Sequence, residues 1–102
     1  MDKNSVTQAK KQATVFRIFG NSRRILILQL LVENEFSVGE IAERIEASLQ
    51  NTSQHLRLMK DKGIVISRRE GQVVYYGIAD NELGDWCKRM FQLHSFEHMN
   101  TY

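Results

Sequence analysis

Apolar residues recur at helical spacing over most of the chain, and this pattern predicts a largely helical protein. A first helix is expected from Val6 to Phe19, ended by Gly20. Ser22 is placed to cap a second helix that runs to about Glu33 and is apolar nearly all round, which predicts a place in the middle of the core. A last amphipathic helix is expected from Asn81 to about Met99.

Two short helices are predicted between these segments. Ser37 and Glu40 have the spacing of a capping box, and apolar residues then follow at i, i+3, i+4 and i+7. Ser48 is a second candidate N-cap, and its helix extends to about Lys62, where Gly63 stops it. The turn between these two helices is only a few residues long. Two short helices joined in this way form a helix-turn-helix, here over residues 37–62.

Residues with high strand propensity follow at once, from Ile64 to Arg69 and from Val73 to Ile78, around a turn at Glu70–Gln72 that contains glycine. This pattern predicts a hairpin over residues 64–78, in the position of a wing. The expected fold is mostly α with a small β-hairpin, a single winged helix-turn-helix domain over residues 1–102 with the order ααααββα.

Composition fits this interpretation without fixing a function. The chain is 42% hydrophobic and 25% charged, has no proline, and carries a net charge of +2, which is too small to indicate nucleic acid by itself. It has one cysteine, Cys87, no apolar core of a signal peptide near its start, and no apolar run long enough to span a bilayer. We therefore expect a cytoplasmic protein without membrane contact.

The predicted second helix of the helix-turn-helix has two unlike faces. At 100° per residue an apolar stripe, expected to face the core, contains Leu49, Thr52, Leu56 and Met59. Amide, hydroxyl and arginine side chains, which can bond to base edges or phosphates, lie opposite this stripe or at its margins. With the capping serine, the candidate DNA-binding residues of this helix are Ser48, Gln50, Asn51, Ser53, Gln54 and Arg57. The alternative is an ordinary solvated helix face.

The hairpin supplies further candidates. Arg68 and Arg69 precede the turn, and Gln72 lies in it, so the tip can reach phosphate or a minor groove. Alternation along a strand puts one arginine on each face. The pair should therefore affect affinity more than sequence choice, and a charged edge strand that resists aggregation is the alternative.

Five short segments, in their order and spacing over residues 16–78, resemble the ArsR/SmtB family. They are Arg24-Ile25-Leu26-Ile27-Leu28, Ser37-Val38-Gly39-Glu40-Ile41-Ala42, Thr52-Ser53-Gln54-His55-Leu56, Gly63-Ile64-Val65 and Arg69-Glu70-Gly71-Gln72-Val73-Val74-Tyr75-Tyr76. The resemblance implies a homodimer held by the helices near 5–19 and 81–99, which binds an inverted repeat in duplex DNA and represses transcription until an inducer acts. It also implies base contacts by Gln50, Ser53 and Gln54. His55 is interpreted as a packed or capping histidine.

The metal sites of that family are not matched. Its third-helix site needs a Cys-x-Cys pair where this chain has Ser37-Val38-Gly39. At the positions of its last-helix site stand Asp80, Glu82, Leu93 and Phe96, so both histidines are missing. We expect no metal and no cofactor.

Two sensing alternatives stay open. His94 and His98 are spaced i and i+4, and with the nearby Glu97 and with Asp85 of the partner subunit they could form a shifted metal site, although two surface histidines are the simpler interpretation. Cys87 could respond to oxidation, although a single cysteine on an apolar helix face is usually inert packing.

Enzyme chemistry has no support in the sequence. It contains no Ser/His/Asp arrangement, Gly-rich phosphate loop or carboxylate pair placed for acid and base work. The predicted function is a sequence-specific regulator of transcription that binds duplex DNA, most simply as a repressor. The alternatives are a metal- or redox-responsive repressor and a winged-helix module for protein contacts.

Overall fold

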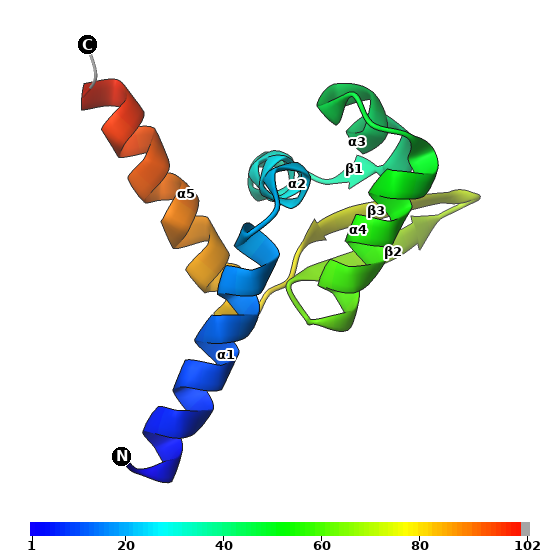
Figure 1. Cartoon of the computed structure of the whole chain (residues 1–102). Helices are drawn as coiled ribbons and strands as arrows, with labels where there is room; N and C mark the ends of the chain where they lie inside the picture. Colours follow the sequence, from blue (N-terminus) through cyan, green and yellow to red (C-terminus); the bar gives the residue numbers. More distant parts are fainter. Residues whose placement is uncertain (101–102) are drawn as a thin grey trace.

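A computed structural model describes the backbone of residues 1–100 and the side chains of residues 1–92. Its elements are α1 (Lys3–Phe19), α2 (Ser22–Glu33), β1 (Phe36–Ser37), α3 (Val38–Ile45), α4 (Leu49–Asp61), β2 (Val65–Glu70), β3 (Val73–Ile78) and α5 (Glu82–Asn100). Figure 1 shows α1 and α5 on one side of α2, and α3, α4 and the hairpin on the other. The predicted fold class is confirmed, with a short extra strand.

Side-chain caps fix where the first two helices begin. The Asp2 carboxylate accepts a hydrogen bond from the backbone N–H of Ser5 at 2.7 Å, so α1 starts at Lys3, earlier than the apolar pattern predicts. The second cap differs from the prediction. Asn21, and not Ser22, caps α2, because the Asn21 side-chain oxygen accepts from the Arg24 N–H at 3.1 Å.

The core is centred on one face of α2. Its buried residues Ile27, Leu28 and Leu31 form one cluster with side chains from α1, α3, α4, α5 and the start of the hairpin. These side chains are Ile18, Ile41, Leu56, Met59, Ile64, Val65 and Cys87. The expected place of α2 in the middle of the molecule agrees with the structure, since α1, α3, α5 and β3 all contact it. Its coverage is incomplete, because Leu26 is 44% exposed.

The sheet has three strands in the order β1-β3-β2, all antiparallel. The hairpin was predicted, and its turn contains Gly71 at φ +63, a left-handed conformation that glycine adopts without cost. The extra strand β1 pairs Phe36 with Tyr76 and Ser37 with Tyr75. It joins the middle of β3 to the start of α3.

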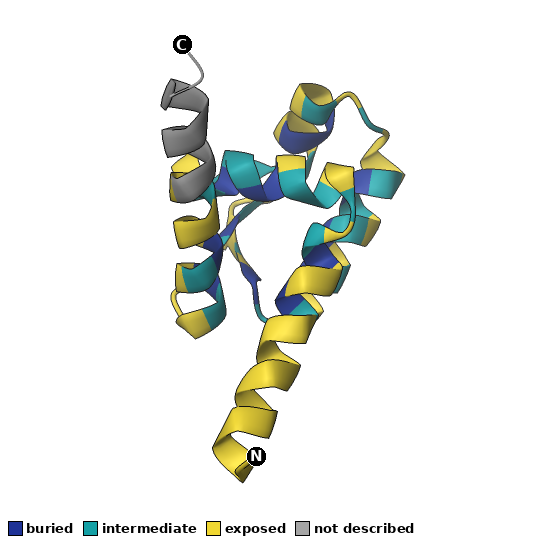
Figure 2. Cartoon of the chain, turned by 60° about the vertical axis from the view of Figure 1, so that its left-hand side comes forward, coloured by how far each residue is buried: buried dark blue, intermediate teal, exposed yellow. Residues whose placement is uncertain are grey.

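Aromatic rings hold α5 against α1. The rings of Phe16 and Trp86 meet edge to face at 5.2 Å between centroids, and those of Phe19 and Phe91 at 5.6 Å. The amino-terminal half of α1 extends past this contact and is exposed along its length (Figure 2). Within the described chain, no helix is long and apolar enough to cross a membrane.

Candidate nucleic-acid interface

The turn between α3 and α4 is set by hydrogen bonds close in sequence. At the start of α3 the predicted capping box is present: the Glu40 N–H donates to Ser37 Oγ at 3.2 Å, and the Ser37 N–H donates to Glu40 Oε1 at 2.9 Å. At its end, Glu46 adopts the left-handed conformation at φ 56. The Ala47 N–H then donates to the Ala42 carbonyl at 3.0 Å, which turns the chain sharply toward α4.

Ser48 positions the first turn of α4. Its side-chain oxygen accepts from the Asn51 N–H at 3.0 Å, and its carbonyl accepts from the fully buried Thr52 hydroxyl at 2.8 Å. The predicted N-cap is therefore confirmed. The Ser48 side-chain oxygen already accepts a hydrogen bond within the helix, and this bond competes with the predicted contact of Ser48 with DNA. The contact with DNA stays a prediction.

The outward face of α4 carries the side chains that the sequence singled out. Gln50, Gln54 and Arg57 are exposed, and Ser53 is half-buried beside them. The predicted core stripe is correct for Thr52, Leu56 and Met59. It is wrong for Leu49, which is 59% exposed, because the first residue of α4 lies beyond the edge of the core.

Two arginines at the start of α2 reach the other side of α4. Arg23 Nη1 donates to Asn51 Oδ1 at 2.7 Å, and Arg24 Nε donates to His55 Nδ1 at 3.3 Å. Desolvation, followed by the charges of Arg24 and Arg23, lowers the pKa of His55. His55 is thus a packed, hydrogen-bonded side chain, as expected.

Arg23 is a candidate interface residue that the sequence reasoning missed. It is exposed and lies beside α4 although 28 positions separate it from Asn51. The one local sign was a pair of adjacent arginines at a helix start. Only the hydrogen bonds of this pair to Asn51 and His55 bring it beside the candidate interface on α4.

The two wing arginines have different surroundings. Arg68 forms ion pairs with Glu35 and Glu70, both at 2.8 Å, and lies 4.8 Å over the Tyr75 ring. The hydrogen bonds to Glu70 and Glu35 raise the pKa of Arg68. Arg69 points to the opposite face of β2 and is exposed, and Gln72 is exposed in the turn. Figure 1 shows this hairpin projecting past α4.

The candidate sensor residues form no cluster in the part of the chain whose side chains are described. Over residues 1–92 no three His, Cys, Asp or Glu side chains lie together as a metal site would need. Glu82 instead accepts from Gln8 Nε2 at 3.2 Å and pairs with Lys11 at 3.6 Å. His94 and His98 fall outside the described side chains, so the shifted metal site stays an untested alternative.

Cys87 is fully buried. Desolvation raises the pKa of its thiol to about 12, so almost none of it is the reactive thiolate at neutral pH. The environment favours the interpretation of this residue as inert packing.

Comparison with known proteins identifies a common family. Residues 21–67 match the model of the arsR family of bacterial regulatory proteins. The transcriptional activator HlyU of Vibrio cholerae is 35% identical over 94 residues, which are 92% of this chain and 83% of HlyU. A CadC homologue of Staphylococcus aureus, a cadmium resistance transcriptional regulatory protein, is 37% identical over 86 residues, which are 83% of this chain and 70% of the relative.

Solved structures agree with the sequence matches. A structure of HlyU from Vibrio cholerae has a TM-score of 0.77 and covers 93% of this chain and 99% of that one. The homodimeric winged helix-turn-helix DNA-binding domain from Mycobacterium bovis has a TM-score of 0.80 at 29% identity, covering 100% of this chain and 94% of that one. The proteins matched are regulators and not enzymes. This chain therefore belongs to the ArsR family and is a transcriptional regulator built on a DNA-binding winged helix-turn-helix.

Proposed function

We propose that the chain acts as a homodimer that represses transcription by placing two copies of α4 in successive major grooves of an inverted repeat. The observation that carries the proposal is the exposed face formed by Gln50, Gln54 and Arg57 on the second helix of the helix-turn-helix. Amides and a guanidinium at this position can bond to base edges, whereas an ordinary solvated helix face is usually rich in Glu and Lys.

Each side chain of this face has a distinct proposed role. Gln50 and Gln54 each offer an amide N–H donor and a carbonyl acceptor, and this pair of groups suits an adenine edge. Ser53 bonds to a base or a phosphate. Arg57, one turn further along α4, takes guanine or phosphate. Together these residues would supply the sequence preference of each half-site.

The wing would add affinity without sequence choice. Arg69 and Gln72 are exposed on the hairpin and can reach the sugar-phosphate chain beside the groove that α4 occupies. For Arg68, the pairs with Glu35 and Glu70 compete with the predicted phosphate contact. We propose Arg69 as the main wing contact and Arg68 as the brace that holds the hairpin.

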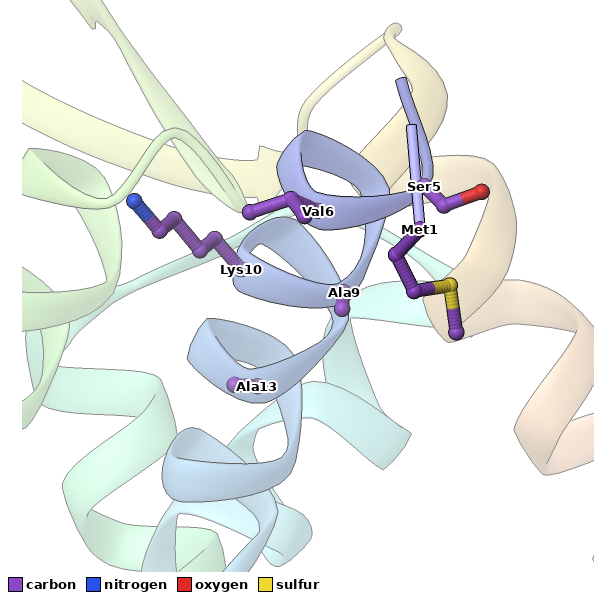
Figure 3. A pocket seen from close by; sticks show the side chains of 6 residues that line it. All are labelled: Met1, Ser5, Val6, Ala9, Lys10 and Ala13. Atoms are coloured by element: carbon purple, nitrogen blue, oxygen red, sulfur yellow. The ribbon is translucent and has the colours of Figure 1, made fainter. Parts of the chain in front are cut away.

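An unpaired apolar surface on α1 and α5 supports the dimer. Val6, Phe16 and Met90 are exposed there, and Phe16 is 58% exposed although the edge-to-face contact with Trp86 covers part of its ring. Along the first turns of α1 a hollow of about 300 Å³ is lined by residues of that helix and its start (Figure 3). The lining residues are Met1, Ser5, Val6, Ala9, Lys10 and Ala13. A second copy of α1 and α5 would cover this surface, in keeping with the homodimeric Mycobacterium bovis domain.

Repression follows from occupancy. A dimer seated on a promoter blocks polymerase, and acting there requires the protein to be in the cytoplasm with its DNA. The named function of the Vibrio cholerae relative is activation. A reporter fused to the bound promoter therefore distinguishes repression from activation. Deleting the gene for this chain should raise expression of the reporter, and a fall in expression would reverse the proposal.

The binding experiment uses the intact dimer. The best duplex is recovered from a random-sequence pool, and its affinity is measured by fluorescence anisotropy over a range of salt. Gln50→Ala with Gln54→Ala should lower that affinity by about 1 to 3 kcal/mol for each lost pair of base contacts, with little effect on a scrambled duplex. Gln29→Ala, a half-buried glutamine on α2 and outside α4, the wing and the proposed dimer helices, is the matched control. Equal losses on both duplexes would refute the base-reading assignment, and no binding at low salt would favour a protein-contact role.

A further inference from the structure

The pairing of Arg23 with Asn51 changes what Asn51 can offer to DNA. Asn51 is the third residue of α4, where its backbone N–H is held by Ser48 and its side chain is half-buried against α2. Arg23 Nη1 lies 2.7 Å from the Asn51 side chain. Since a guanidinium has only donors, the Asn51 atom that faces it must be the carbonyl oxygen.

This orientation leaves the Asn51 amide group as a donor. Reading adenine bidentately needs a donor and an acceptor from the same side chain. Turning Oδ1 outward would give up the bond to Arg23 and leave the guanidinium facing the Asn51 amide N–H groups. Asn51 therefore suits a partner that has only acceptors.

Arg23 also suits a partner that has only hydrogen-bond acceptors. One of its five N–H groups bonds to Asn51, and its exposed side chain leaves the others accessible at the edge of the recognition helix. Among the ion pairs of the described residues, none involves Arg23. Arg24 beside it adds a second positive charge that is bonded to His55, one turn further along α4.

We propose that Arg23 and Asn51 form a two-residue, donor-only clamp that binds one phosphodiester group of the DNA backbone in each half-site. The phosphodiester is the DNA group that offers acceptors and negative charge without donors. The clamp would fix the register of α4 on the duplex, while Gln50 and Gln54 read bases. This inference rests on the proposed DNA binding and assigns Asn51 to backbone contact instead of base reading.

The test compares the intact dimer and its variants on two duplexes, the best sequence from the random pool and a scrambled sequence of the same composition. Arg23→Gln should weaken binding to both duplexes by the same factor. The slope of log K against log salt should fall by about 0.9 for each clamp, hence by nearly 2 for the dimer. Arg23→Lys keeps the charge and should keep the slope. Asn51→Ala should weaken binding to both duplexes equally.

Arg89→Gln is the matched control, because it removes the same charge from an exposed position on α5, a helix that lies on the other side of α2 from α4 (Figure 1). Sedimentation at the assay concentration checks that every variant remains dimeric. An unchanged salt slope in Arg23→Gln, or a loss in Asn51→Ala confined to the selected duplex, would overturn the clamp. Wild-type protein that binds neither duplex would instead overturn the proposed DNA binding, a result distinct from failure of the clamp.

Discussion

The start of α5 leaves no room for a side chain at Gly84, and this gives the sharpest stability prediction. A Cβ added at Gly84 would lie 1.8 Å from the Ala79 carbonyl oxygen, 2.9 Å from the Ala79 carbonyl carbon and 3.0 Å from Ile78 Cγ2. The nearest obstacle is backbone, which cannot rotate aside. To reach even the 3.0 Å limit for real Cβ contacts, α5 must move about 1.2 Å away from the chain that follows β3.

That chain is held in place. The Ala79 N–H donates to the Ile64 carbonyl at 2.8 Å, and Asn81 Nδ2 donates to the Gly63 carbonyl at 2.9 Å. Overpacking of this kind costs about 1 to 3 kcal/mol, and a rigid backbone obstacle places Gly84→Ala at the upper end. Alanine recovers about 1 kcal/mol of helix propensity. The net loss should be roughly 2 kcal/mol, which lowers the melting temperature by roughly 8 to 16 °C for a domain of this size.

Circular dichroism at 222 nm, at one fixed protein concentration, measures this change, since the stability of a dimer depends on concentration. Gly39→Ala is the matched control, because a Cβ there meets nothing within 4 Å on the exposed side of α3. It should melt at or slightly above the wild-type temperature. If Gly84→Ala melted as high as Gly39→Ala, the assigned packing of α5 on Ala79 would be incorrect.

Three further predictions follow from caps and titrating groups. Asn21→Ala should cost about 1 kcal/mol in urea unfolding while Ser22→Ala changes little, because Asn21 is the cap of α2; equal effects would contradict that assignment. His55 has a pKa below 6.5 in the folded chain, so the unfolded chain binds more protons as pH falls through 6.5, and stability is lost there. Removing this histidine in His55→Gln should flatten the stability profile below pH 6.5, and a constant difference between the two proteins from pH 5 to 7.5 would refute the reasoning. Cys87 should resist a thiol reagent in the folded protein and react in urea, so fast labelling of the native dimer would show that the thiol is accessible.

Local signals in the sequence predicted much of the architecture. The capping box of Ser37 and Glu40, the cap at Ser48 and the glycine turn at Gly71 each act within a few residues, so their geometry can be inferred from spacing alone. The strand β1 gave no such signal. Two residues are too few to show alternation, and Phe36–Ser37 is a strand only because β3 lies beside it.

Features that depend on packing between distant segments were missed or misjudged. A helical projection places Leu49 in the apolar stripe but does not indicate that the first residue of α4 lies beyond the edge of the core. It also places Asn51 at the margin of the reading face without revealing Arg23 as its partner. Likewise, alternation put Arg68 and Arg69 on opposite faces but could not show that Glu35 faces only Arg68.

The strand β1 has a mechanical consequence. Ser37 is at once the residue paired with Tyr75 of the hairpin and the cap of α3, and the Phe36 ring beside it stacks under Arg44 at 4.5 Å. The angle between hairpin and helix-turn-helix therefore cannot change without breaking these contacts, so the parts of one protomer that face DNA move as a rigid unit. Two such units can differ only in their separation and tilt across the dimer axis. Because half-sites lie about 34 to 36 Å apart, a signal that releases this protein from DNA should act by changing that separation, and each protomer should keep its internal shape.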